Sequence, residues 1–179
     1  MNVYDFDNTI YDGESLIDFF FFLISKNKKL ILYIPLIGYT AVLYKLEYLS
    51  IDKLYYLAGK MSSIVINNKE NANKFIKEFW EKYQYKLKKE YLNKIRNEDV
   101  IITASPDILI LGIKNILNTE NIICSKFNLD TGKFDFICFR ENKAKAFKEK
   151  YPNNYIKEFY TDSLNDIVKK KKVKRIIPK

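Results

Sequence analysis

The sequence has 179 residues, a net charge of +9 and 47% hydrophobic residues, which excludes a disordered chain and allows one domain or a core with one insertion. It contains no histidine, so serine–histidine triads, cysteine–histidine dyads and histidine-ligated zinc or iron sites are excluded. Carboxylates, lysines, hydroxyl groups or a hard metal ion must therefore carry any chemistry.

The positive charge comes almost entirely from lysine. Only Arg96, Arg140 and Arg175 are arginines, and arginine is the residue that usually reads nucleic-acid phosphates and bases. We therefore expect no nucleic-acid partner, although a positive surface attracts anionic substrates or lipid headgroups. Cys124 and Cys138 are too few for a disulfide framework or a four-cysteine zinc site. The absence of a secretory signal ahead of the first acidic residues predicts a cytoplasmic protein.

The first part of the chain reads as one short strand followed by helices. Residues 2–4 form the predicted strand, which runs into a polar loop. The apolar and amphipathic patterns that follow predict helices in four segments, 16–25, 30–44 (interrupted by Pro35 and Gly38), a helix beginning near Ser50, and 71–95.

After residue 98 short apolar runs alternate with helical patterns. The expected strands are 100–102, 121–124 and 155–160, the expected helices are 106–118 and 142–151, and 127–138 is an expected hairpin that turns at 130–132. This alternation predicts an α/β fold with a mostly parallel sheet and an all-helical segment inserted after the first strand.

The helical segment also raises the question of membrane contact. Lys26, Lys28 and Lys29 divide its two apolar stretches and Pro35 interrupts the longer one, so neither reaches the ~20 apolar residues of a membrane span. An aromatic-rich segment flanked by lysines is nevertheless typical of helices that lie on a membrane surface. Burial against neighbouring helices and peripheral membrane contact both stay open.

Polar motifs follow three of the apolar strands, at residues 5–9, 103–106 and 161–166. The carboxyl ends of parallel strands converge on one crevice, which would bring together Asp5, Asp7, Thr103 and the later acidic residues, with Lys143 at the start of a helix. Clustered carboxylates need a cation, and a set of oxygen ligands selects Mg²⁺ over zinc. Two neighbouring carboxylates suit a nucleophile and an acid/base, while a lysine and a hydroxyl suit a phosphoryl group.

At these residues the sequence resembles the haloacid dehalogenase (HAD) superfamily of phosphohydrolases, in the phosphoserine-phosphatase-like branch with a helical type-1 cap. The resemblance implies a Rossmann-like three-layer catalytic core at residues 1–13 and 99–179 and a helical cap at 14–98. It implies that Asp5 is the nucleophile that forms an aspartyl-phosphate and that Asp7 is the general acid/base. A response-regulator receiver domain uses similar residues, but in a different order along the chain.

The resemblance also assigns the remaining site residues. It implies phosphate binding by Asn8, Thr103, Ser105 and Lys143, and Mg²⁺ binding by Asp5, Asp7, Asp162 and Asp166. Asn8 stands where glycine is commonest in the family, and asparagine tolerates left-handed backbone. Glu14, Ser15 and Arg140 are expected on the substrate side of the cap.

The expected function is therefore a Mg²⁺-dependent phosphatase acting on a small phosphomonoester through an aspartyl-phosphate. Two alternatives stay open. One is a membrane-peripheral protein that binds or hydrolyses a lipid phosphate, as the aromatic cap suggests. The other is a phosphate-binding protein without activity, because only thirteen residues follow Asp166.

Overall fold

The computed structural model of the chain describes residues 1–162 and 174–176. Its strands form one sheet in the order β4-β3-β2-β1-β5-β6, and every neighbouring pair is parallel except β3 and β4. The strands are β1 (Val3–Asp5), β2 (Val100–Pro106), β3 (Ile122–Asn128), β4 (Lys133–Phe136), β5 (Glu158–Tyr160) and β6 (Lys174–Ile176). The predicted mostly parallel α/β sheet is confirmed.

The chain between β1 and β2 is entirely helical, as predicted. It contains α1 (Ser15–Lys26), η1 (Lys28–Tyr33), α2 (Ile34–Lys45), α3 (Ile51–Val65), α4 (Lys69–Tyr83), η2 (Gln84–Lys86) and α5 (Lys89–Leu92). The later helices are α6 (Asp107–Ile110), η3 (Leu111–Ile113) and α7 (Glu141–Lys150). The exact division between a core and a cap stays a prediction.

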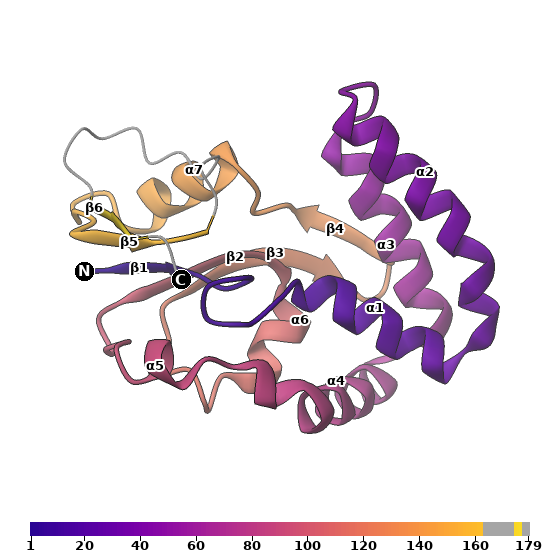
Figure 1. The fold of residues 1–179 in the computed structure, drawn as a ribbon, viewed down its shortest axis with the longest axis horizontal. Helices are drawn as coiled ribbons and strands as arrows, with labels where there is room; N and C mark the ends of the chain where they lie inside the picture. The colour runs from indigo at the N-terminus through magenta and orange to yellow at the C-terminus, as the bar shows by residue number, and fades with distance from the viewer. Residues whose placement is uncertain (163–173, 177–179) are drawn as a thin grey trace.

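Alternation along the central strands explains why helices cover both faces of the sheet. In β1 and β2, Val3 and Val100 pack with Phe147 of α7, whereas Tyr4 and Ile101 pack on the opposite side with the cluster that contains the α4 and α6 residues. Figure 1 shows α7 on one side of the sheet and α4, α5 and α6 on the other. The fold is therefore the three-layer arrangement expected for the core.

Helix α4 returns to the sheet instead of extending away from it. Nε1 of Trp80 donates a hydrogen bond of 2.8 Å to the carbonyl of Leu109 in α6. The Trp80 ring also meets the rings of Phe6 and Tyr11 edge to face, at centroid distances of 6.2 and 5.8 Å. In Figure 1, α1, α2 and α3 form a group that projects beyond the end of the sheet opposite β5 and β6, and α1 stays packed on α4 through the rings of Phe19 and Phe79, 5.2 Å apart.

Two helix predictions differ from the structure. The helix expected over 71–95 ends at Tyr83, because the next residues turn to bond with the loop after β1: Asp12 N–H donates to the Lys86 carbonyl at 2.9 Å and Lys88 N–H to the Ile10 carbonyl at 2.8 Å. Pro35 does not interrupt a helix. It lies in the first turn of α2, where its missing N–H has no intrahelical partner to lose.

The second half of the chain also differs at element ends. The helix predicted from Pro106 to residue 118 is replaced by the short α6 and η3. Helix α6 begins one residue late because Pro106 keeps extended backbone (ψ 146°) and belongs to β2. Strand β3 begins at Ile122 and β5 is shorter than expected. The predicted hairpin is confirmed: Asn128 pairs with Lys133, and Gly132 in the turn has a φ of 63°.

Candidate active site at the carboxyl end of β1

The loop after β1 is wound tightly around one carbonyl group. Asp5 is the last residue of β1, and its Oδ1 accepts a hydrogen bond of 2.8 Å from the N–H of Phe6. Asn8 has a φ of 56° and donates its N–H to the Gly13 carbonyl at 3.0 Å, so it takes the left-handed conformation expected at this position. The Phe6 carbonyl accepts hydrogen bonds from the N–H groups of Thr9, Ile10 and Tyr11.

Lys143, in the first turn of α7, forms an ion pair with Asp5. Its Nζ lies 2.9 Å from Oδ2 of Asp5, and both side chains are buried, with exposed fractions of 9% and 8%. Removing one member of such a pair leaves a buried charge uncompensated, which typically destabilises a protein by about 3–5 kcal/mol. Asp5 and Lys143 are therefore held together by the fold, as their motifs predicted.

Asp7 is held by three donors from two different elements. Its Oδ1 accepts from the N–H of Ser15 at 2.7 Å, and its Oδ2 accepts from the Ser105 hydroxyl at 2.8 Å and, at a longer 3.4 Å, from Thr103. Burial raises the pKa of the Asp7 carboxyl group, while the hydrogen bonds from Ser15 and Ser105 and the charge of Lys143 oppose that rise. A carboxyl group whose pKa is raised in this way is suited to donate and accept a proton during catalysis.

The end of β2 is irregular where it supplies these hydroxyl groups. Ile102 pairs with Ile123, but the next pairing on β2 is Pro106 with Ser125, so β2 carries extra residues between the two positions. Such irregularities redirect side chains and are common beside active sites. Here the Ser105 N–H donates to the Thr103 hydroxyl at 3.0 Å. Both buried side chains thereby face Asp7.

Two residues that support this irregular segment have no signal in the sequence. Tyr55 of α3 donates its hydroxyl to the Ala104 carbonyl at 3.0 Å, and Ser125 of β3 donates to the same oxygen at 2.6 Å. Burial raises the pKa of Tyr55, so its phenol stays protonated. Tyr55 sits within an ordinary amphipathic helix and Ser125 within a strand, so no motif marks either one.

The expected substrate-side residues lie at the start of α1. The side-chain amide of Asn8 donates to Oε1 of Glu14 at 2.7 Å. The hydroxyl groups of Ser15 and Ser105 are 2.8 Å apart, which connects α1 directly to β2. Ser15 therefore bonds to the site residues themselves and is buried.

Arg140 occupies a different position from Glu14 and Ser15. It precedes α7 with a φ of 48°, and its guanidinium lies over the ring of Phe139 at 5.3 Å and over that of Tyr44, near the end of α2, at 5.7 Å. Arg140 thus bridges the segment before Lys143 and the projecting helices. A glycine at this position would leave these ring contacts unmade.

Acidic groups gather on the side of the site nearest β5. Partial burial and then the negative charge of Asp7 raise the pKa of Glu14, and the charge of Asp162 contributes in the same direction. Asp162 follows β5, which pairs with β1, and its side chain is exposed. The fourth expected ligand, Asp166, lies outside the described residues.

The candidate metal ligands near Asp5 have the chemistry that a hard cation such as Mg²⁺ prefers. Asp5, the Asp7 carbonyl and Asp162 offer only oxygen atoms, from the ends of neighbouring strands β1 and β5. After burial, the negative charges of Asp7 and Asp162 also raise the pKa of Glu14, whereas the charge of Lys143 lowers it. Within residues 1–162 no three acidic or cysteine side chains stand close enough to form a complete metal cluster.

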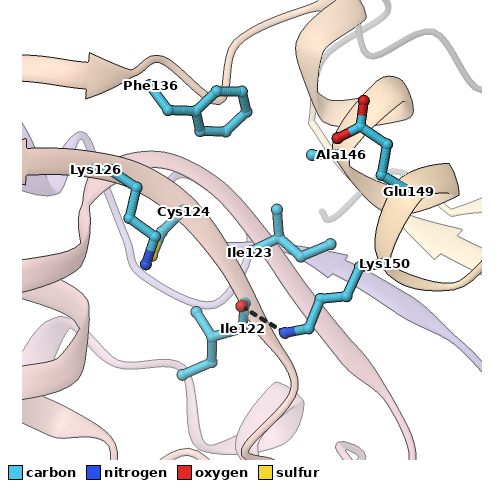
Figure 2. A pocket seen from close by; sticks show the side chains of 8 residues that line it. All are labelled: Ile122, Ile123, Cys124, Lys126, Phe136, Ala146, Glu149 and Lys150. Atoms are coloured by element: carbon cyan, nitrogen blue, oxygen red, sulfur yellow. Dashed lines mark hydrogen bonds between the residues drawn. The ribbon is translucent and has the colours of Figure 1, made fainter.

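A depression in the surface lies apart from these residues. It has a volume of about 490 Å³ and opens between the start of β3 and the end of α7 (Figure 2). Lys150 donates there to the Ile122 carbonyl at 3.2 Å, and burial raises the pKa of the Cys124 thiol to about 11, so it is not a reactive thiolate. None of the predicted site residues lines this depression.

Known proteins resemble this chain in sequence pattern and in fold. The sequence model of haloacid dehalogenase-like hydrolases matches residues 3–168. A comparison with curated proteins gave no match. A solved protein of unknown function from Bordetella pertussis shares 14% identity with a TM-score of 0.78, over 93% of this chain and 83% of its own.

Two other solved structures support the same fold. A phosphoserine phosphohydrolase-like protein from Francisella tularensis is 22% identical, with a TM-score of 0.62 over 93% of this chain and 80% of its own. A HAD family hydrolase from Salmonella enterica serovar Typhi is 13% identical, with a TM-score of 0.53 over 92% of this chain and 56% of its own. Since the family match runs from β1 past β5 and includes every motif described above, the chain belongs to the haloacid dehalogenase-like hydrolases.

Proposed function

We propose that this protein is a Mg²⁺-dependent phosphatase that hydrolyses a phosphomonoester through an aspartyl-phosphate on Asp5. The observation that carries the proposal is the pairing at the end of β1. Nζ of Lys143 lies 2.9 Å from Asp5, and the Ser105 hydroxyl lies 2.8 Å from Asp7. A nucleophile beside a fixed cation and an acid/base beside hydroxyl donors are the parts that phosphoryl transfer requires.

In the first step a carboxylate oxygen of Asp5 attacks the phosphorus and the ester P–O bond breaks. The leaving oxygen takes the bonding electron pair and receives a proton from the Asp7 carboxyl group. Burial, which raises the pKa of Asp7, favours the protonated form that this step needs. Lys143 neutralises charge on the nucleophile and on the non-bridging oxygens.

In the second step water attacks the phosphorus of the aspartyl-phosphate. The Asp7 carboxylate accepts the proton of this water, the bond between Asp5 and phosphorus breaks, and phosphate leaves. Thr103 and Ser105 are buried donors that can hold phosphate oxygens in both steps. Bound Mg²⁺, with Asp5, the Asp7 carbonyl and Asp162 as oxygen donors, would supply charge neutralisation.

In this proposal the leaving group of the substrate adjoins the start of α1. We place the leaving group beside Glu14 and Ser15 at the start of α1, because these residues adjoin Asp7 and Asn8. The fold neighbour named as phosphoserine phosphohydrolase-like is consistent with a small phosphomonoester.

Hydrolysis of p-nitrophenyl phosphate, measured with Mg²⁺ and with a chelator, tests the proposal. Asp5→Asn is expected to lower kcat by at least about 10³-fold, because it removes the nucleophile. Asp12→Asn is the matched control, since Asp12 is an acid of the same loop with a side chain that is 74% exposed and forms an ion pair with Lys88 at 3.5 Å. The control is expected to stay within about 2-fold of the native rate.

A second measurement examines the intermediate itself. Acid quenching during turnover of a phosphorus-labelled aryl phosphate is expected to trap label on the protein, and hydroxylamine is expected to release it. Asp5→Asn should trap none. Turnover that is unaffected by Asp5→Asn, or no turnover at all with Mg²⁺ present, would overturn the proposal.

A further inference from the structure

Helix α2 is apolar but most of its side chains are in solvent. Thr40 is its one buried residue, whereas Leu36, Tyr39 and Val42 have exposed fractions of 42%, 63% and 56%. With Leu46, which is 58% exposed, they repeat at intervals of three or four residues and therefore lie along one side of the helix. We refer to Leu36, Tyr39, Val42 and Leu46 as the α2 face.

The α2 face lies at an outer edge of the molecule. Figure 1 shows α2 on the outside of α3, at the end of the fold away from β5 and β6. Just before α2, Ile31 and Leu32 add exposed fractions of 49% and 80%. A contiguous exposed apolar surface of this kind marks an interaction site in soluble domains.

The charge around the α2 face is mostly positive. Residues 19–46 contain four lysines and no acidic residue, and the exposed Glu47 follows directly after Leu46. Lys26 pairs with Glu78, whereas Lys28, Lys29 and Lys45 are exposed, and no ion pair neutralises them among the side chains that the structure describes. The apolar face is therefore bordered by a net positive charge, with Lys28, Lys29 and Lys45 against Glu47.

We propose that the α2 face binds the surface of a membrane that contains anionic lipids. Apolar side chains would enter the boundary of the acyl region while Lys28, Lys29 and Lys45 contact anionic headgroups. A second copy of the chain fits less well, because a two-fold interface would place these lysines against their own copies. This proposal does not depend on phosphatase activity.

The length of α2 fixes how it would meet the bilayer. Its 12 residues extend over about 18 Å, shorter than the ~30 Å hydrocarbon core. No helix in residues 1–162 is long and apolar enough to cross a membrane. The helix would therefore lie in the interface, parallel to the bilayer plane.

Flotation with lipid vesicles tests the proposal on the full chain. Binding is expected to vesicles of phosphatidylcholine with about 30% phosphatidylglycerol and to be much weaker with phosphatidylcholine alone. Raising the salt from about 0.1 to 0.5 M should reduce the anionic binding several-fold, because salt screens the lysines. Absence of binding to the anionic vesicles at low salt would overturn the proposal.

Charge variants show whether the lysines beside α2 are responsible. The double variant Lys28→Glu and Lys29→Glu is expected to lower the partition coefficient by at least about 20-fold. The matched control reverses two exposed lysines of α4, Lys69→Glu and Lys74→Glu, and has the same net charge. Equal losses in both double variants would show attraction by net charge alone and would contradict a specific face.

Apolar variants complete the test. Tyr39→Ser is expected to weaken binding about 5–10-fold, whereas Tyr85→Ser, at a tyrosine that is more exposed (75%) and lies outside the α2 face, is expected to have no effect. Asp5→Asn should bind as the native chain does, which separates membrane binding from catalysis. Sedimentation that shows a dimer abolished by Tyr39→Ser, without vesicle binding, would assign the face to a second copy instead.

Discussion

Gly59 lies where α3 crosses the hairpin formed by β3 and β4. A Cβ atom at this position would stand 2.4 Å from the carbonyl oxygen of Gly132 and 3.3 Å from the ring of Phe127. Gly132 lies in the hairpin turn with a φ of 63°, and its N–H donates to the Asn128 carbonyl at 2.9 Å, so moving its carbonyl would disturb the turn. Gly38 in the neighbouring α2 offers the matched comparison, because a Cβ there meets nothing within 4 Å.

The same substitution should therefore change stability in opposite directions. Alanine favours a helix interior over glycine by about 1 kcal/mol, so Gly38→Ala is expected to raise the free energy of unfolding by about 0.5–1 kcal/mol. At Gly59 the contact with a backbone carbonyl adds an overpacking penalty of about 1–3 kcal/mol. The expected net loss for Gly59→Ala is about 1–2 kcal/mol.

Urea unfolding measures both effects. Trp80 is the one tryptophan in the sequence and is buried, so its fluorescence reports the core, while far-ultraviolet circular dichroism reports the helices. With a denaturant slope of about 2 kcal/mol/M, the midpoints of the two variants are expected to differ by about 1 M. Equal midpoints for Gly38→Ala and Gly59→Ala would refute the reasoning, because they would show that α3 does not press on the hairpin.

Two further predictions concern the core and the site. Trp80→Phe removes the hydrogen bond to Leu109 and part of the ring packing, and is expected to lower the free energy of unfolding by about 2 kcal/mol in a thermal melt. In chelator, Asp7→Asn is expected to be more stable than the native chain at pH 7, because asparagine can keep the partners Ser15 and Ser105 without a buried charge. Because folding raises the pKa of the Asp7 carboxyl group, the free energy of unfolding of the native chain falls as the pH rises from about 4 through that raised pKa. The stability advantage of Asp7→Asn should therefore disappear near pH 3. An advantage that grows toward acid pH would contradict this sign.

The sequence predicted the placement of the main site residues because that placement depends on local rules. Asp5 ends β1, Asp162 follows β5, and Thr103 comes directly after the regular pairing of β2 stops at Ile102; parallel strands bring their carboxyl ends together. Asn8 was expected to tolerate left-handed backbone, and its φ is positive. These features need only the period of the strand and the conformational preferences of single residues.

Other features depend on contacts between distant segments and could not be predicted. The amphipathic pattern continues past Tyr83, yet α4 ends there because Lys86 and Lys88 form backbone hydrogen bonds with the loop after β1. The hydroxyl contact between Ser15 and Ser105 joins residues 90 positions apart. No periodicity in the sequence encodes either contact, since each one arises only when α1 and η2 have docked.

The hydrogen bond from the Ser15 N–H to Asp7 links the first residue of α1 to a proton-transfer group. An ionised carboxylate accepts such a bond more strongly than a protonated carboxyl group does. By thermodynamic reciprocity, displacement of α1 would raise the proton affinity of Asp7, and protonation of Asp7 would loosen α1 by the same free energy. In the proposed reaction Asp7 gives its proton to the leaving group as the aspartyl-phosphate forms and accepts one from water as the intermediate is hydrolysed. The projecting helices would then be held most firmly when the intermediate must be shielded, and released as the cycle ends.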